Sequence, residues 1–194
     1  MRLKYNSPVI LTYTFICVAV LGIRYMLGDE IGKNFMTTYF TAPAKSQFSL
    51  TTPLFYFRLI SHAIGHANWA HLIGNFSFIL LIGPMLEEKY GSTVLLEMMF
   101  ITAFITGLLN SLFFSNLILG ASGIVFMLIL LSSFTNFKSG DIPLTLVLII
   151  IMYLAKEVIS SFNDDNISQY GHIMGGIIGA GFGFVITGNK EAYK

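Results

Sequence analysis

Six segments of this sequence are long enough and apolar enough to be membrane-spanning helices. A spanning helix needs about 20 predominantly apolar residues. Hydrophobic residues make up 55% of the chain and charged residues only 11%, whereas soluble domains are about 25% charged. The sequence therefore predicts an all-α, polytopic membrane protein, a single domain of six transmembrane helices over residues 1–194. The expected helices cover residues 8–27, 71–86, 93–114, 121–137, 142–159 and 171–187.

The connection between the first two expected helices is much longer than the others. It covers about residues 28–70 and carries Pro43, Pro53 and several aromatic residues. A connection of this length in a compact domain is usually functional. We therefore expect an interfacial loop that caps one side of the helix bundle.

The distribution of Lys and Arg indicates an orientation in the membrane. With the N-terminus inside, six basic residues lie on the cytoplasmic side and five outside, three of them in the long first loop, where charges weigh less. We expect a multi-pass protein of the plasma (inner) membrane with both termini in the cytoplasm. No small-residue cleavage site follows residues 8–27, so we expect this helix to be retained as an anchor. The net charge of +1 argues against nucleic acid as a partner, and the expected environment is the lipid bilayer.

Polar residues gather at the starts of the second, fourth and sixth expected helices. The second begins with His71 and Asn75, the fourth with Ser122 and the sixth with His172. With six spans, these three helices run in the same direction. At a rise of about 1.5 Å per residue, their first turns share one membrane side and a similar depth. Because polar side chains are costly within a membrane, these four residues are candidates for a functional site.

Glycines indicate how two of these helices pack. Small residues four apart let membrane helices approach backbone to backbone, and the sixth helix carries Gly171, Gly175, Gly179 and Gly183. The natural neighbour is the fourth helix, where small residues flank Ser122. In that arrangement Ser122 and His172 lie within hydrogen-bond reach, as a nucleophile and a general base require.

Each of these features has a plainer interpretation when it is taken alone. A serine in a membrane helix most often bonds its own backbone or a neighbouring helix. A series of glycines is usually packing, and a lone His172 could be a proton relay or a gating residue. Their combination on one membrane side favours a catalytic site.

The motifs resemble those of the rhomboid family of intramembrane serine proteases, in its minimal six-helix bacterial form. The family's H-x-x-x-N at the second helix matches residues 71–75, its G-x-S-G at the fourth matches residues 120–123, and its histidine followed by glycines at the sixth matches residues 172–176. Phe126 stands where family members often have a tyrosine packed on the catalytic histidine, so the hydroxyl is lost. Further matches are Arg58, the series His62, His66 and His71, and the block Gly83–Glu87 followed by Gly91 and Ser92.

The resemblance implies a Ser–His dyad without a third carboxylate. The early turns of the three helices carry no Asp or Glu, and only Asp164 and Asp165 precede the sixth helix on the outer side. The implied function is that of a serine endopeptidase that cleaves membrane-anchored proteins in or near their transmembrane segment, with an active site open to the outer side. The implied roles are Ser122 as nucleophile, His172 as general base, and His71, Asn75 and the Ser122 backbone N–H as oxyanion donors, supported by Gly120, Gly123, Phe126, Gly175 and His66.

This chemistry requires no cofactor, and we expect no metal site. His62 and His66 are four apart but lack the inner glutamate of a zinc-protease motif; they either line a water-filled cavity or pack within the loop. Thr102, Thr106 and Asn110 share one helix face and either hold water or pair helices, with pairing favoured.

One alternative function is a rhomboid-like protein that binds membrane clients without cutting them. Another is a small transporter with a histidine relay, but the sequence lacks the inverted repeats and mid-membrane charges expected there.

Overall fold

Nearly all regular structure in the described part of the chain is helical. The computed structural model describes residues 5–134, 144, 147–148, 151–152 and 169–189. The only pairing of extended backbone among these residues is an isolated bridge between Ala42 and Ile118. The elements are α1 (Pro8–Met26), α2 (Asp29–Tyr39), η1 (Lys45–Gln47), α3 (Pro53–Ser61), α4 (Trp69–Tyr90), α5 (Ser92–Phe113), α6 (Ser122–Phe134) and α8 (Gln169–Asn189).

Three of the described helices, α1, α4 and α5, are long and apolar enough to cross a membrane, and α6 and α8 contain shorter apolar helical segments. These five helices correspond to five of the six expected spans. The remaining expected span, residues 142–159, lies mostly outside the described residues. Five of its positions are described and are helical, namely 144, 147, 148, 151 and 152. An all-helical bundle suits a bilayer because each helix satisfies its own backbone hydrogen bonds.

The second span, α4, is longer at both ends than the expected 71–86. It begins at Trp69 because the side chain of Asn68 caps the helix, accepting a hydrogen bond of 2.8 Å from the backbone N–H of His71. Pro84 lies inside the helix without ending it. The helix ends at Tyr90, because the next residue, Gly91, has a φ of 84°, a left-handed conformation that favours glycine.

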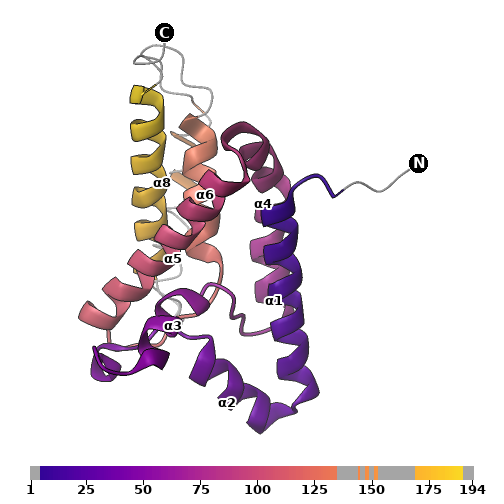
Figure 1. Ribbon diagram of the computed structural model, residues 1–194, viewed down its shortest axis with the longest axis vertical. Helices are drawn as coiled ribbons and strands as arrows, with labels where there is room; N and C mark the ends of the chain where they lie inside the picture. Colours follow the sequence, from indigo (N-terminus) through magenta and orange to yellow (C-terminus); the bar gives the residue numbers. More distant parts are fainter. Residues whose placement is uncertain (1–4, 135–143, 145–146, 149–150, 153–168, 190–194) are drawn as a thin grey trace.

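Helices α4, α6 and α8 begin at the same end of the bundle (Figure 1). The glycine contacts give the direction for α6 and α8: Gly175 lies against Gly123, and Gly179 lies against Met127. From the first contact to the second, the residue number rises by four in both helices, so the two helices are parallel. The expected shared direction of the second, fourth and sixth spans is therefore present in the structure.

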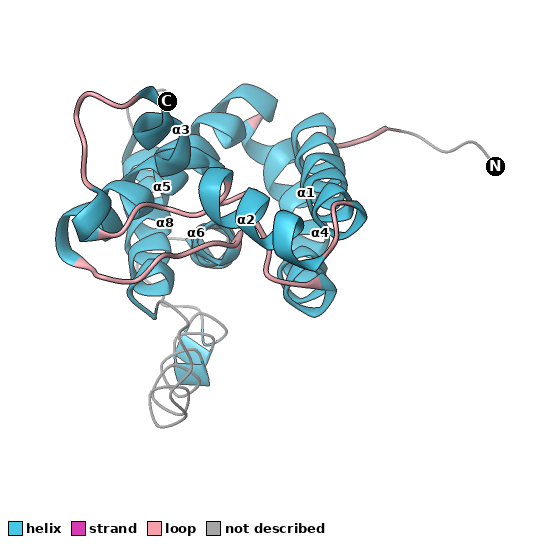
Figure 2. Cartoon of the chain, turned by 90° about the horizontal axis from the view of Figure 1, so that it is seen from below, coloured by secondary structure: helices cyan, strands magenta, loops and turns pink. Residues whose placement is uncertain are grey.

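The segment expected to be a loop, residues 28–70, contains two α-helices and a short 3-10 helix, and in this respect the expectation was incomplete. Figures 1 and 2 show α2 and α3 gathered at the end of the bundle where α1 ends and α4 begins. Gly32 of α2 lies against the backbone of Arg24 in α1, and Gly107 of α5 lies against Leu59 of α3. These close approaches fix the segment to the two long helices beside it.

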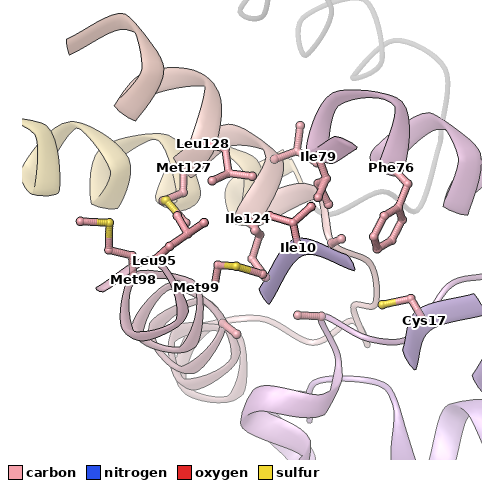
Figure 3. Close-up of a cluster of buried hydrophobic side chains, with 14 of the residues drawn as sticks. Ile10, Cys17, Phe76, Ile79, Leu95, Met98, Met99, Ile124, Met127 and Leu128 are labelled. Atoms are coloured by element: carbon pink, nitrogen blue, oxygen red, sulfur yellow. The ribbon is translucent and has the colours of Figure 1, made fainter. Parts of the chain in front are cut away.

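The hydrophobic core lies between α1, α4, α5 and α6 (Figure 3). Side chains at its centre, such as Ile79, Leu95 and Met127, are fully buried. Many large apolar side chains on the same helices are exposed instead, among them Phe15, Leu81 and Phe100. Apolar residues on both the inner and outer faces are what a helix needs when its outer face contacts lipid.

Candidate active site

His71 and Asn75 lie against the turn that leads into α6. They occupy one face of the first turns of α4, being four residues apart. A Cβ atom placed on Gly120 would lie 2.8 Å from His71 Nε2 and 3.7 Å from Asn75 Nδ2. Gly120 has a φ of 128°, a backbone conformation that residues other than glycine rarely adopt. Glycine at this position therefore permits both the turn and the close approach of the two side chains.

Ser122 is the first residue of α6, two residues after Gly120. The segment before it is held by backbone hydrogen bonds to the first loop. The N–H of Ala42 donates to Ile118 O at 2.8 Å, and the N–H of Gly120 donates to His62 O at 2.9 Å. The first N–H groups of a helix have no partner within it and carry the positive end of the helix dipole. The half-buried Ser122 is therefore at a position suited to the stabilisation of negative charge.

His172 lies in the first turn of α8, and its side chain is outside the described residues. The helix that carries it is closely packed on α6. A Cβ on Gly175 would lie 2.8 Å from the Cα of Gly123, and a Cβ on Gly179 would lie 2.7 Å from the Cα of Met127. Gly175 is one turn after His172, and Gly123 directly follows Ser122. The first turns of α6 and α8 are thus neighbours, as the glycine spacing predicted.

His66, which was expected to support the site and either to line a cavity or to pack within the loop, lies beside Asn75. Its Nε2 is 3.2 Å from Asn75 Nδ2 and 3.5 Å from the backbone nitrogen of Ala121, and its Nδ1 is 3.1 Å from Ile64 O. The imidazole is fully buried, and its ring centre is 5.1 Å from that of His71. Burial, with a smaller effect from His71, lowers the pKa of His66 to about 4 from the ordinary 6.5.

His62 is also buried, but its imidazole contacts α5. Its Nε2 lies 3.0 Å from Ala103 O and 3.5 Å from Thr106 Oγ1. Burial lowers its pKa to about 4. Thr102 and Thr106 donate to carbonyl groups one turn back in their own helix, at 2.7 and 2.8 Å. Asn110 donates to Pro43 O and Asn116 O, both at 2.9 Å, so it ties α5 to the loop between α2 and η1 and to the loop between α5 and α6.

Two further residues singled out from the sequence, Phe126 and Arg58, make packing and loop contacts. Phe126 is half-buried and packs against the core. Arg58 donates to Thr41 O at 2.9 Å and to Gln47 Oε1 at 3.0 Å, which braces the first loop. Asp164 and Asp165 lie outside the described residues. Among the described residues, no group of three His, Cys, Asp or Glu side chains could hold a metal ion.

Sequence reasoning did not find two backbone contacts that hold the segment before Ser122. The backbone of Ala42 pairs with Ile118, and the carbonyl of His62 accepts from Gly120. Backbone groups leave no residue-type signal, and the paired segments lie far apart in the chain. A short motif therefore has no way to indicate these contacts.

Comparison with known proteins places this arrangement in a family. The model of the Rhomboid domain matches residues 54–189, which is more than half of the chain. The chain belongs to the Rhomboid domain family. The matched region runs from the start of α3 to the end of α8, so it includes the side chains of the candidate site, from His66 on the segment before α4 to His172 on α8.

Curated relatives of this rhomboid chain are named as proteases. The chain is 26% identical to rhomboid protease GlpG of Haemophilus influenzae over 186 residues, covering 94% of this chain and 93% of that protein. It is 29% identical to rhomboid protease GluP of Bacillus subtilis over 187 residues, which cover 93% of this chain and 36% of that protein. It is 24% identical to rhomboid protease GlpG of Yersinia pestis over 187 residues, covering 95% of this chain and 64% of that protein. The expected all-α, polytopic membrane fold and the family resemblance are both confirmed.

Proposed function

We propose that this rhomboid chain is an intramembrane serine endopeptidase with a Ser122–His172 dyad. The observation that carries the proposal is the convergence at the start of α6. His71 and Asn75 lie against Gly120 on one side, and the helix carrying His172 packs on Gly123. The names of the relatives support the same reaction class.

In the proposed reaction, Ser122 Oγ attacks the scissile carbonyl carbon while His172 removes its proton. The carbonyl oxygen becomes an anion held by the side chains of His71 and Asn75 and by the backbone N–H of Ser122. The C–N bond then breaks, and His172 returns the proton to the leaving amine. Water, activated by His172, hydrolyses the acyl-enzyme in the second half of the reaction.

The proposed substrates are membrane-anchored proteins, cleaved in or near a transmembrane segment. The proposed location is the plasma (inner) membrane, with the whole chain forming one domain and both termini cytoplasmic. In this orientation the site opens to the outer side of the membrane, at the end of the bundle where α2 and α3 lie (Figure 2). Access to water at that end would supply the hydrolytic step.

The test is cleavage of a labelled single-span substrate by the purified protein in detergent. Ser122→Ala and His172→Ala are each expected to abolish nearly all cleavage while thermal stability stays near that of the wild type. A fluorophosphonate should label Ser122 in the wild type and not in Ser122→Ala, and EDTA should leave the rate unchanged. Wild-type cleavage by Ser122→Ala would refute the mechanism. Substrate binding without cleavage by the wild type would instead favour a client-binding protein.

A further inference from the structure

His66 makes three polar contacts, and in two of them the partner can act only as an acceptor or only as a donor. The carbonyl oxygen of Ile64, 3.1 Å from Nδ1, can only accept a hydrogen bond. The backbone N–H of Ala121, 3.5 Å from Nε2, can only donate. The third group is the side-chain amide of Asn75, whose nitrogen lies 3.2 Å from the same Nε2.

These contacts select one tautomer of His66. The proton must be on Nδ1 to serve Ile64 O, so Nε2 of the neutral ring carries a lone pair. The single lone pair of the unprotonated Nε2 can accept only from N–H groups, and it lies within reach of both the Ala121 N–H and the Asn75 amide. It therefore holds the Asn75 amide with Nδ2, rather than Oδ1, toward the ring. The orientation of the Asn75 amide is set by a chain of hydrogen bonds that starts at a backbone carbonyl.

We propose that His66 is a positioning residue for the oxyanion site and that it acts through Asn75 and the backbone at Ala121. The inference rests on the proposed protease function. One N–H of the Asn75 amide is committed to His66, and the second is left for the developing anion beside Gly120. If the amide turned over, Oδ1 would face the anion and repel it. His66 thus keeps a donor at the place where negative charge forms.

The neutral state that this role needs is favoured by the surroundings of His66. The imidazole is fully buried, its neighbours include the rings of His71 and Phe76, and burial lowers its pKa. A group that stays neutral at pH 7 with its Nε2 already accepting two N–H groups is unsuited to proton transfer. The structure therefore separates His66 from the acid–base role proposed for His172.

His62 provides a matched comparison within the same segment. Both histidines are buried, and burial lowers the pKa of both to about 4. The imidazole of His62, however, contacts Ala103 and Thr106 of α5. Loss of either ring should affect folding stability, whereas only loss of the His66 ring should affect Asn75.

The first test measures kcat and KM for Ser122-dependent cleavage in three variants. His66→Leu removes the acceptor and should lower kcat about 10-fold, less than the loss of an oxyanion donor itself, with KM little changed. His66→Gln can offer an oxygen near the position of Nε2 and should recover most of kcat. His62→Leu should keep kcat near the wild-type value at a temperature where it is folded. A His66→Leu variant that is folded and has wild-type kcat would overturn the inference.

The second test asks whether His66 acts through Asn75. In an Asn75→Ala background, His66→Leu should lower kcat much less than it does in the wild type, because the amide that it orients is gone. If the two losses multiply in full, His66 acts independently of Asn75 and the inference fails. Cleavage that survives Ser122→Ala is a different failure, since it refutes the proposed function itself.

The third test uses the wild-type protein, so it does not depend on whether a variant folds. Nitrogen-15 NMR of the histidine-labelled wild-type protein distinguishes the two imidazole tautomers. We expect the buried His66 ring to have a protonated Nδ1 and an unprotonated Nε2 at pH 7. The opposite tautomer, or a doubly protonated ring, would leave Nε2 unable to accept from Asn75 and would overturn the inference.

Discussion

Gly175 of α8 lies so close to Gly123 of α6 that a Cβ atom on Gly175 would be 2.8 Å from the Cα of Gly123. Real Cβ atoms essentially never approach a neighbour this closely, so the two helix backbones would have to separate. The contact lies one turn after His172 and one residue after Ser122. Its geometry therefore controls the distance across the proposed dyad.

Gly175→Ala should reduce stability and activity together. We expect a loss of about 1–3 kcal/mol in the free energy of unfolding, as for other overpacked interiors, and a lower kcat because α8 moves away from Ser122. Thermal stability and cleavage rate in the same detergent measure both effects. Gly181→Ala is the matched control, because a Cβ there meets nothing within 4 Å. Unchanged stability in Gly175→Ala would contradict close backbone contact.

The two proposed side-chain oxyanion donors should differ in importance. Asn75→Ala should lower kcat by about 100-fold or less, the low end for one donor, because free N–H groups at the start of α6 partly compensate. His71→Ala should be worse, since the imidazole lies nearer Gly120 and fills the wall of the site.

The check on this grading is a titration of cleavage rate against substrate for each variant. Stabilisation of a transition state appears in kcat, whereas uniform binding appears in KM. A raised KM with an unchanged kcat in Asn75→Ala would make Asn75 a binding or structural residue.

Glu87→Gln should destabilise the protein without acting at the site. Near the end of α4, the buried carboxylate of Glu87 accepts hydrogen bonds from the backbone N–H groups of Val9 and Ile10, at 3.0 and 3.1 Å, and from Ser92 Oγ at 2.7 Å. It thus satisfies free N–H groups in the first turn of α1 and places negative charge at that helix's positive end. An amide has only one acceptor oxygen, so we expect a loss of about 1–3 kcal/mol from a buried group left unsatisfied.

Glu88→Gln is the control for this variant, because Glu88 is exposed beside Glu87 on the same helix. Chemical or thermal unfolding in detergent compares the two, and kcat per folded molecule should be unchanged in both. Equal stability of the two variants would show that the capping contact contributes nothing measurable.

Acidification should destabilise the protein through its two buried histidines. The pKa of both His62 and His66 is lowered to about 4 in the folded protein, whereas the ordinary value is 6.5. Between these values the unfolded chain binds more protons, so stability is fully present above pH 6.5 and is lost as the pH falls toward 4. The full loss is about 3 kcal/mol for each histidine.

Melting temperatures between pH 7 and pH 5 test this prediction, because most carboxylates stay ionised in that window. Any folded variant that replaces His62 or His66 with a group that does not titrate should show a shallower pH dependence than the wild type. If the melting temperature of the His62 variant and of the His66 variant falls with pH as steeply as that of the wild type, the destabilisation comes from other groups.

Local patterns in the sequence determined the all-helical membrane fold, the order of the spans and the identities of the site candidates. Apolar runs are set by composition alone, and HxxxN, GASG and the glycine series are contiguous, so their spacing on a helix follows from helical geometry. The parallel starts of α4, α6 and α8 followed from counting spans. For the same reason, the close packing of α8 on α6 was predictable from glycines four residues apart.

Contacts between distant segments could be seen only in the folded structure. The folding of residues 28–70 into α2, η1 and α3, the capping of α1 by Glu87, and the pairing of Ala42 with Ile118 have no local pattern that is specific to them. His66 is the clearest case: its sequence position allowed either cavity lining or loop packing. Its role depends on Asn75, Ala121 and Ile64 meeting around one ring. Short helices and buried hydrogen bonds of this kind are stabilised by neighbours that come together only when the chain folds.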